Sequence, residues 1–85
     1  MRQKVRQGEY VMTLHADDEM NADECTIEDV ESGIMSGSVV ERQKDHRTGE
    51  WKYRIRGVTS EQKDLDVVVK LGVTGKVVII TVFVP

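Results

Sequence analysis

The 85-residue sequence contains a single cysteine, Cys25, and a single proline, Pro85. One cysteine excludes both a disulfide within the chain and a zinc site built from cysteines, which fits a reducing compartment. The longest apolar run, residues 77–84, is interrupted by Thr81, whereas a membrane-spanning helix needs about 20 apolar residues. No apolar segment follows the basic start of the chain, so no signal peptide is expected. We therefore expect a cytoplasmic protein without membrane contact.

Length and composition favour one small globular domain over residues 1–85. The chain is 39% hydrophobic and 32% charged, which lies in the globular range. A chain this short buries only about 60–65% of its unfolded surface, so a broad functional surface is favoured over a deep pocket. Residues 1–38 hold three basic and nine acidic residues, and residues 39–85 hold nine basic and six acidic residues. This asymmetry permits a local anion-binding face despite a net charge of −3.

Helix signals occupy the first half of the chain. Residues 2–7 fit a short basic helix, and Thr13 is placed to cap a helix over residues 14–22. Thr26 and Asp29 form a capping-box pattern that opens a further helix, which we expect to end near Gly37.

From residue 38 onward, the hydrophobic period changes from that of a helix to that of a strand. The last apolar run is hydrophobic on both faces, which predicts a central or doubly covered strand. Short polar loops favour antiparallel neighbours. The expected strands cover residues 39–44, 51–57, 65–71 and 76–84. The sequence therefore predicts an α+β fold in which two N-terminal helices precede a four-stranded, mainly antiparallel, twisted sheet.

The expected strand at residues 51–57 carries cations at every second position. Their side chains would project from one face at a spacing of about 6.6–7 Å, close to the phosphate repeat of an extended nucleic-acid strand. The alternative is a solvated outer face on which each cation pairs with a nearby acid. Trp51 and Tyr53 fall on the opposite face, where we expect core packing. The candidate RNA-binding residues are Lys44, Arg47, Lys52, Arg54, Arg56 and Lys70.

Two histidines are candidates for acid–base chemistry. His46 lies in a polar loop beside a cation, and it is either a general acid or base or a solvated loop residue. His15 opens the acidic helix, where it either titrates in a reaction or forms a structural hydrogen bond to a nearby acid. The acids of residues 17–24 lack the spacing of a calcium loop, so we expect neither a metal nor a cofactor.

Short motifs spread over most of the chain resemble a known family. Thr13-Leu14-His15-Ala16 stands near the start, and Ile79-Ile80-Thr81-Val82-Phe83 with Pro85 stands at the end. This order resembles small bacterial and archaeal domains of unknown function with the motifs T-x-H-A and I-I-T-V-Y-x-P. That family is similar to toxins of the RelE/ParE and BrnT group. The resemblance implies a ribonuclease-like toxin fold and an antitoxin-like protein partner.

The resemblance also implies a mechanism that needs no metal. Basic sheet residues would hold RNA and stabilise a phosphorane-like transition state while the 2′-hydroxyl of the RNA attacks. The chain has Val58, Asp66 and Phe83 where family members often have arginine, histidine and tyrosine. These replacements leave open a binding role without catalysis. The candidate catalytic residues are His15, His46, Arg54 and Arg56.

A second hypothesis from the same residues is an interaction domain without catalysis. The acidic helix and the basic strand of two chains would pair in a homodimer or a heterodimer, and the association would weaken with salt. RNA and a protein partner are thus the two classes of ligand that the sequence predicts.

Overall fold

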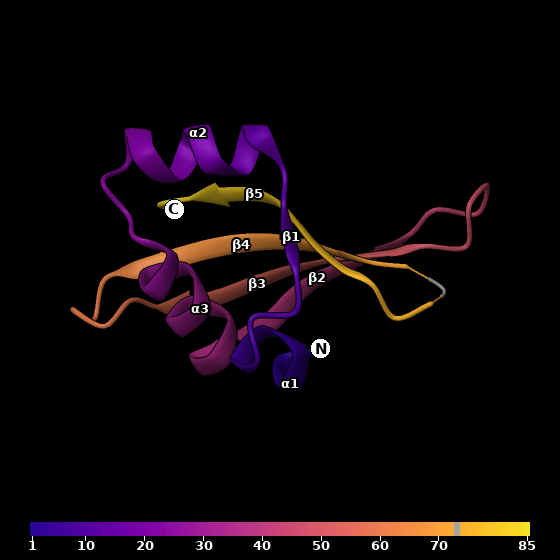
Figure 1. Ribbon diagram of the computed structural model, residues 1–85, viewed down its shortest axis with the longest axis horizontal. Helices are drawn as coiled ribbons and strands as arrows, with labels where there is room; N and C mark the ends of the chain where they lie inside the picture. Colours follow the sequence, from indigo (N-terminus) through magenta and orange to yellow (C-terminus); the bar gives the residue numbers. More distant parts are fainter. Residues whose placement is uncertain (73) are drawn as a thin grey trace.

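The computed structural model describes residues 1–72 and 74–85, and over these residues three helices pack against a five-stranded sheet (Figure 1). No helix of this described part is both long enough and apolar enough to cross a membrane. The elements in chain order are α1 (Arg2–Arg6), β1 (Val11–Met12), α2 (Leu14–Ala22), α3 (Ile27–Ser36), β2 (Ser38–Lys44), β3 (Trp51–Val58), β4 (Asp64–Leu71) and β5 (Val77–Phe83).

Local capping interactions start α2 and α3 at the predicted residues. The hydroxyl of Thr13 accepts a hydrogen bond of 3.1 Å from the backbone N–H of Ala16. At α3, Thr26 and Asp29 form a reciprocal capping box, with hydrogen bonds of 3.2 and 3.0 Å. The single cap of α2 and the capping box of α3 satisfy N–H groups that the first helical turn would otherwise leave unpaired. Both predicted helix starts are confirmed.

The α+β class is confirmed, but the predicted strand number is wrong. The sheet has five strands in the order β1-β5-β4-β3-β2, and β1 pairs in parallel with β5 through Val11 and Val78. The other three pairs of neighbours are antiparallel, as predicted. A two-residue strand has no periodicity of its own, so the sequence gives no sign of its distant partner. The basic segment at the start of the chain is indeed helical, so α1 adds a third helix to the two predicted.

Helix α2 fastens the outer edge of β5 beyond the end of β1. The N–H of Thr13 donates to the carbonyl oxygen of Ile79 at 3.0 Å, and the N–H of Val82 donates to Glu19 Oε1 at 3.1 Å. Both bonds satisfy edge groups that a strand would otherwise expose. Figure 1 shows α2 running alongside β5, while α1 and α3 lie near β2 and β3.

The core lies between the helices and one face of the sheet. Alternate residues of β4 point into it and are fully buried, as the period of two predicts. The core residues are Val5, Ala16, Met20, Val30, Ile34, Ile55, Leu65, Val67, Val69, Val77, Ile79 and Val82. Helix α3 approaches β3 closely at Gly57, where an added Cβ would overlap the carbonyl oxygen of Gly33. The absence of side chains at Gly33 and Gly57 therefore allows α3 and β3 to approach each other this closely.

The opposite side of the sheet carries the charged residues of β3 and β4, and we call it the open face. In register, Lys52 lies beside Lys70, Arg54 beside Val68, and Arg56 beside Asp66. On β5, Phe83 pairs with Asp66 and Thr81 with Val68; on β2, Glu41 pairs with Arg54 and Gln43 with Lys52. The core packing of the other face thus fixes which polar side chains become neighbours here.

Candidate functional site

Two arginines of β3 converge on one buried carboxylate at the centre of the open face. Asp66 has no exposed surface. Its Oδ2 accepts from Arg54 Nε at 2.6 Å and from Arg56 Nη2 at 3.1 Å, and its Oδ1 accepts from Arg56 Nε at 2.9 Å. Burial of a charge is costly unless it is paired, and here both carboxylate oxygens are paired. The cluster of Arg54, Arg56 and Asp66 retains one positive charge in excess.

The ion pairs fix the protonation states of the cluster. Hydrogen bonds from Arg56, and then from Arg54, outweigh the effect of burial and hold the pKa of Asp66 below its ordinary value. The same carboxylate raises the pKa of Arg56. Asp66 is therefore ionised at neutral pH, and it acts as a fixed anion between two fixed cations.

Arg54 is held by an aromatic ring as well as by Asp66. Its guanidinium carbon lies 5.1 Å from the centre of the Phe83 ring, a distance typical of a cation–π contact. The side chain is 33% exposed, whereas that of Arg56 is 47% exposed. Arg54 thus has a defined orientation at the surface, which a solvated surface cation lacks.

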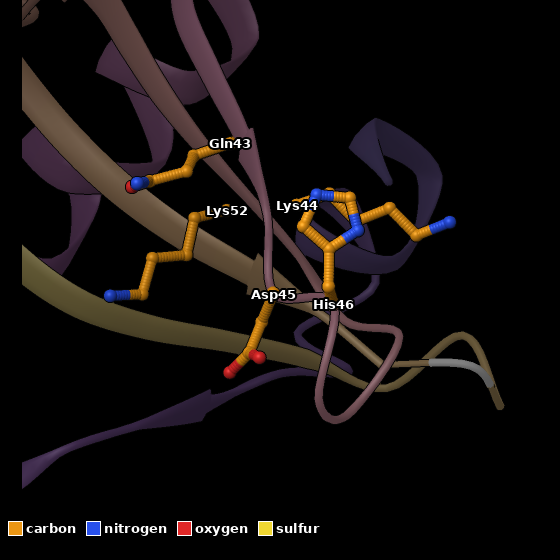
Figure 2. A pocket seen from close by; sticks show the side chains of 5 residues that line it. All are labelled: Gln43, Lys44, Asp45, His46 and Lys52. Atoms are coloured by element: carbon orange, nitrogen blue, oxygen red, sulfur yellow. The ribbon is translucent and has the colours of Figure 1, made fainter.

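Two shallow hollows lie along β2 and β3, and Arg54 lines one of them. One, of about 190 Å³, is lined by Glu41, Gln43, Lys52, Arg54 and Val68. The other, of about 310 Å³, is lined by Gln43, Lys44, Asp45, His46 and Lys52. Because Gln43 and Lys52 line both, the hollows are neighbours. Figure 2 shows Gln43 and Lys52 on one side of the β2 backbone, and Lys44 and His46 on its other side.

Beyond the helices, the β2–β3 hairpin continues as an arm at one end of the molecule (Figure 1). Trp51 is half-buried here, stacked on Tyr53 with ring centres 6.3 Å apart. Arg42 and Lys44 lie 5.8 and 5.6 Å from the centre of the Trp51 ring. Tyr53 packs against the core, as predicted, but Trp51 lies outside the buried cluster and instead carries two cations.

The remaining predicted cations differ in their surroundings. Lys70 pairs with Glu50 at 2.9 Å, and this contact lowers the pKa of Glu50. Arg47 is exposed in the β2–β3 turn, where its backbone N–H donates to Asp45. Lys52 is exposed on the open face. The alternative of paired surface cations therefore holds for Lys70 and for the two arginines.

His15 lies apart from the other candidate catalytic residues. It belongs to α2, and its Nε2 lies 3.2 Å from Glu19 Oε1. The same Glu19 oxygen accepts the N–H of Val82, so His15 supports the fastening of α2 to β5. His46 is in the β2–β3 turn, and Figure 1 shows that this turn and α2 are separated along the long axis. The structure places His46 beside Lys44, on the side of the β2 backbone opposite Lys52, and it does not bring His15 there (Figure 2).

Sequence reasoning missed the residues that organise Arg54. From the sequence, Asp66 and Phe83 were noted only as positions where the chain departs from the pattern of the family that it resembles. A usable signal was present, because Asp66 is a lone acid inside the apolar run Leu65–Val69. An unpaired acid is rarely fully buried, so its position already implied cationic partners.

Helices on one face of a largely antiparallel sheet, with an arginine–aspartate cluster on the other, define a class of small α+β domain with a polar sheet face. The chain belongs to the family described as Domain of unknown function (DUF4258), whose model matches residues 12–84. No curated protein and no solved structure matches the chain. The expected membership of a family of unknown function is thereby confirmed.

Proposed function

We propose that the chain is a toxin-like RNA-binding domain that holds single-stranded RNA along its open face. The observation that carries the proposal is the pair of cations Lys52 and Arg54, which line one hollow together, while a second hollow adjoins it at Lys52. Arg56 lines neither hollow, because both oxygens of Asp66 hold its guanidinium group. Cations on alternate strand positions match the spacing of phosphates in an extended strand. The shallow, uncovered shape suits an extended polymer better than a small enclosed ligand.

The β2–β3 arm extends this surface toward the turn. Lys44 and His46 line the hollow that Lys52 also lines, but their side chains lie on the other side of the β2 backbone. An RNA strand would therefore pass from Arg54 and Lys52 around the edge of β2 toward His46. In this proposal His46 would donate or accept a proton, and Arg54 would stabilise charge on a phosphate. The sequence motifs resemble a family that is similar to RelE/ParE and BrnT toxins, and on that resemblance we also propose an antitoxin-like protein as a second ligand.

Replacing Lys44 and Lys52 by alanine should weaken binding of a short single-stranded RNA by about tenfold or more at low salt. Each lost phosphate contact should also reduce the slope of log affinity against log salt by about 0.7. Fluorescence anisotropy with a labelled RNA, titrated across salt, measures both quantities. The double variant Arg6→Ala/Lys63→Ala removes the same charge from other exposed positions and should bind like the wild type.

Equal weakening by the two double variants would mean that overall charge, and not this surface, attracts RNA. Cleavage is followed in the same tubes with a chelator present. Cleavage that His46→Gln abolishes while RNA affinity is retained would add an endoribonuclease activity to binding. Intact RNA at full binding would leave a binding domain without catalysis.

The outer edge of β2 supports a second candidate function, self-association through this strand. All seven residues of β2 are exposed, and Val39 and Val40 are 48% and 49% exposed. Within the described chain, β2 pairs with β3 only, so its other side presents free backbone groups. Such an edge is a template for pairing with another strand, although the register shift between Val39 and Glu41 and the flanking charges partly protect it.

For this second candidate, light scattering after size exclusion should give a dimer mass at high protein concentration and low salt. Val40→Lys, which places a charge on the exposed edge, should return the protein to a monomer without loss of folding. A wild type that stays monomeric under these conditions would remove self-association through β2.

A further inference from the structure

The two arginines of the cluster use their guanidinium groups differently. Arg56 donates to both oxygens of Asp66 through Nε and Nη2. Arg54 donates to Asp66 through Nε. Within the residues that the structure describes, Nη1 and Nη2 of Arg54 make no hydrogen bond to the protein. An arginine held by Nε can still present its outer pair of nitrogens to a planar or tetrahedral anion.

The two arginines also face different surroundings. Arg54 lines the 190 Å³ hollow together with Lys52 and Gln43, whose cation and amide can both donate to an anion. Arg56 is not among the residues lining this hollow. Of the two arginines, Arg54 therefore has both a fixed orientation and access to the 190 Å³ hollow.

Resting on the proposed function, we propose that this hollow is a phosphate subsite in which Nη1 and Nη2 of Arg54 grip one phosphodiester of the bound RNA. Lys52 contributes a second charge. Asp66 and Phe83 are positioning residues that hold the guanidinium group in the required orientation, and Arg56 keeps Asp66 in place without touching the ligand. The bond lengths to Asp66 and the 5.1 Å contact to Phe83 support this division of roles.

Preorganisation is the physical reason for such an arrangement. A free surface arginine loses side-chain entropy when it binds, whereas Arg54 is already ordered by Asp66 and Phe83. The excess positive charge of the cluster favours an anion. Glu41 acts in the opposite direction, because its carboxylate lines the same hollow beside Lys52. Removing the charge of Glu41 should therefore strengthen phosphate binding.

The test compares Arg54→Lys with Arg56→Lys as its matched control. Both variants keep the charge, and each loses the arginine fork at one position only. Arg54→Lys should weaken RNA binding by about tenfold, because a lysine cannot form the bidentate contact. Arg56→Lys should bind within about twofold of the wild type, and Glu41→Gln should bind about two- to fivefold more tightly. Urea unfolding of each variant shows that folding is retained at the temperature of the binding assay.

A second measurement separates positioning from a merely structural role. Inorganic phosphate is titrated at constant ionic strength while the Nε–Hε signal of Arg54 is followed by NMR. The signal should shift with phosphate and not with chloride, and in Phe83→Leu the shift should require several-fold more phosphate. A purely structural Phe83 would alter the urea midpoint and leave the phosphate dependence unchanged.

The two proposals fail in different ways. RNA binding that Arg56→Lys weakens as much as Arg54→Lys would overturn the subsite and leave the proposed function standing. Absence of RNA binding at low salt, together with a phosphate-specific shift at Arg54, would overturn the proposed function and leave an anion subsite. A signal from Arg54 that responds equally to phosphate and chloride would overturn the subsite on its own.

Discussion

Gly57→Ala should lower the free energy of unfolding by about 3 kcal/mol or more. A urea titration at 25 °C should show a much lower midpoint than that of the wild type, with much of the variant already unfolded at low urea. The added Cβ would overlap the carbonyl oxygen of Gly33 and lie 2.8 Å from Ser36 Oγ. The first of these atoms belongs to the helix backbone, so no side-chain rotation relieves the overlap. Helix α3 would have to move away from β3, and the core between them would open.

Gly33→Ala is the matched control from the other side of the same crossing. Its Cβ would meet Leu65 Cδ2 at 3.3 Å, and this atom is the end of a flexible side chain. Alanine also favours the helical conformation over glycine by up to about 1 kcal/mol. We expect the free energy of unfolding to change by less than about 1 kcal/mol. Similar losses in both variants would show that the crossing rejects an added methyl group on either side, independently of the contact with the Gly33 carbonyl oxygen.

Asp66→Asn should lower the free energy of unfolding at pH 7 by about 2 kcal/mol, measured by urea denaturation. The variant keeps the shape of the side chain and removes the charge to which Arg54 and Arg56 donate. The loss is smaller than for a wholly buried pair, because both arginines are partly exposed and can turn toward water.

The pH dependence of this difference has a definite sign. Because the folded-state pKa of Asp66 lies below its unfolded value, the carboxylate stabilises the fold above the ordinary aspartate pKa of about 3.9. That contribution is lost as the pH falls through the folded-state pKa. The gap between wild type and Asp66→Asn should therefore be largest near pH 7 and should narrow at about pH 3. Asp64→Asn, exposed on the same strand, should leave the urea midpoint unchanged at either pH.

Local signals predicted most of the fold. The caps at Thr13 and Thr26, the alternation in β4, and the polar turns all act within a few residues, so they can be read from one sequence. The parallel pairing of β1 with β5 joins distant segments, and a two-residue strand offers no pattern that identifies its partner. The close approach of Gly57 to Gly33 is equally a product of tertiary packing.

The candidate site was only partly predictable for the same reason. Alternation placed Lys52, Arg54 and Arg56 on one face, and the structure agrees. Their pairing with Asp66 depends on the register between β3 and β4, which the sequence of either strand leaves open. A short motif led to the prediction that His15 belongs to the site. In the structure His15 contacts Glu19, and this contact is part of the docking of α2 on β5.

The fastening of α2 to β5 has a consequence for the order in which the chain folds. The bonds of Thr13 to Ile80 and of Val82 to Glu19 span 67 and 63 residues, whereas the hairpins from β2 to β5 join neighbours in sequence. Loop-closure entropy lets the hairpins close early and delays the long-range pair. The ion cluster of Arg54, Arg56 and Asp66 lies within one hairpin, so it can assemble during translation. The outer edge of β5 stays open to other strands until α2 and β1 reach it.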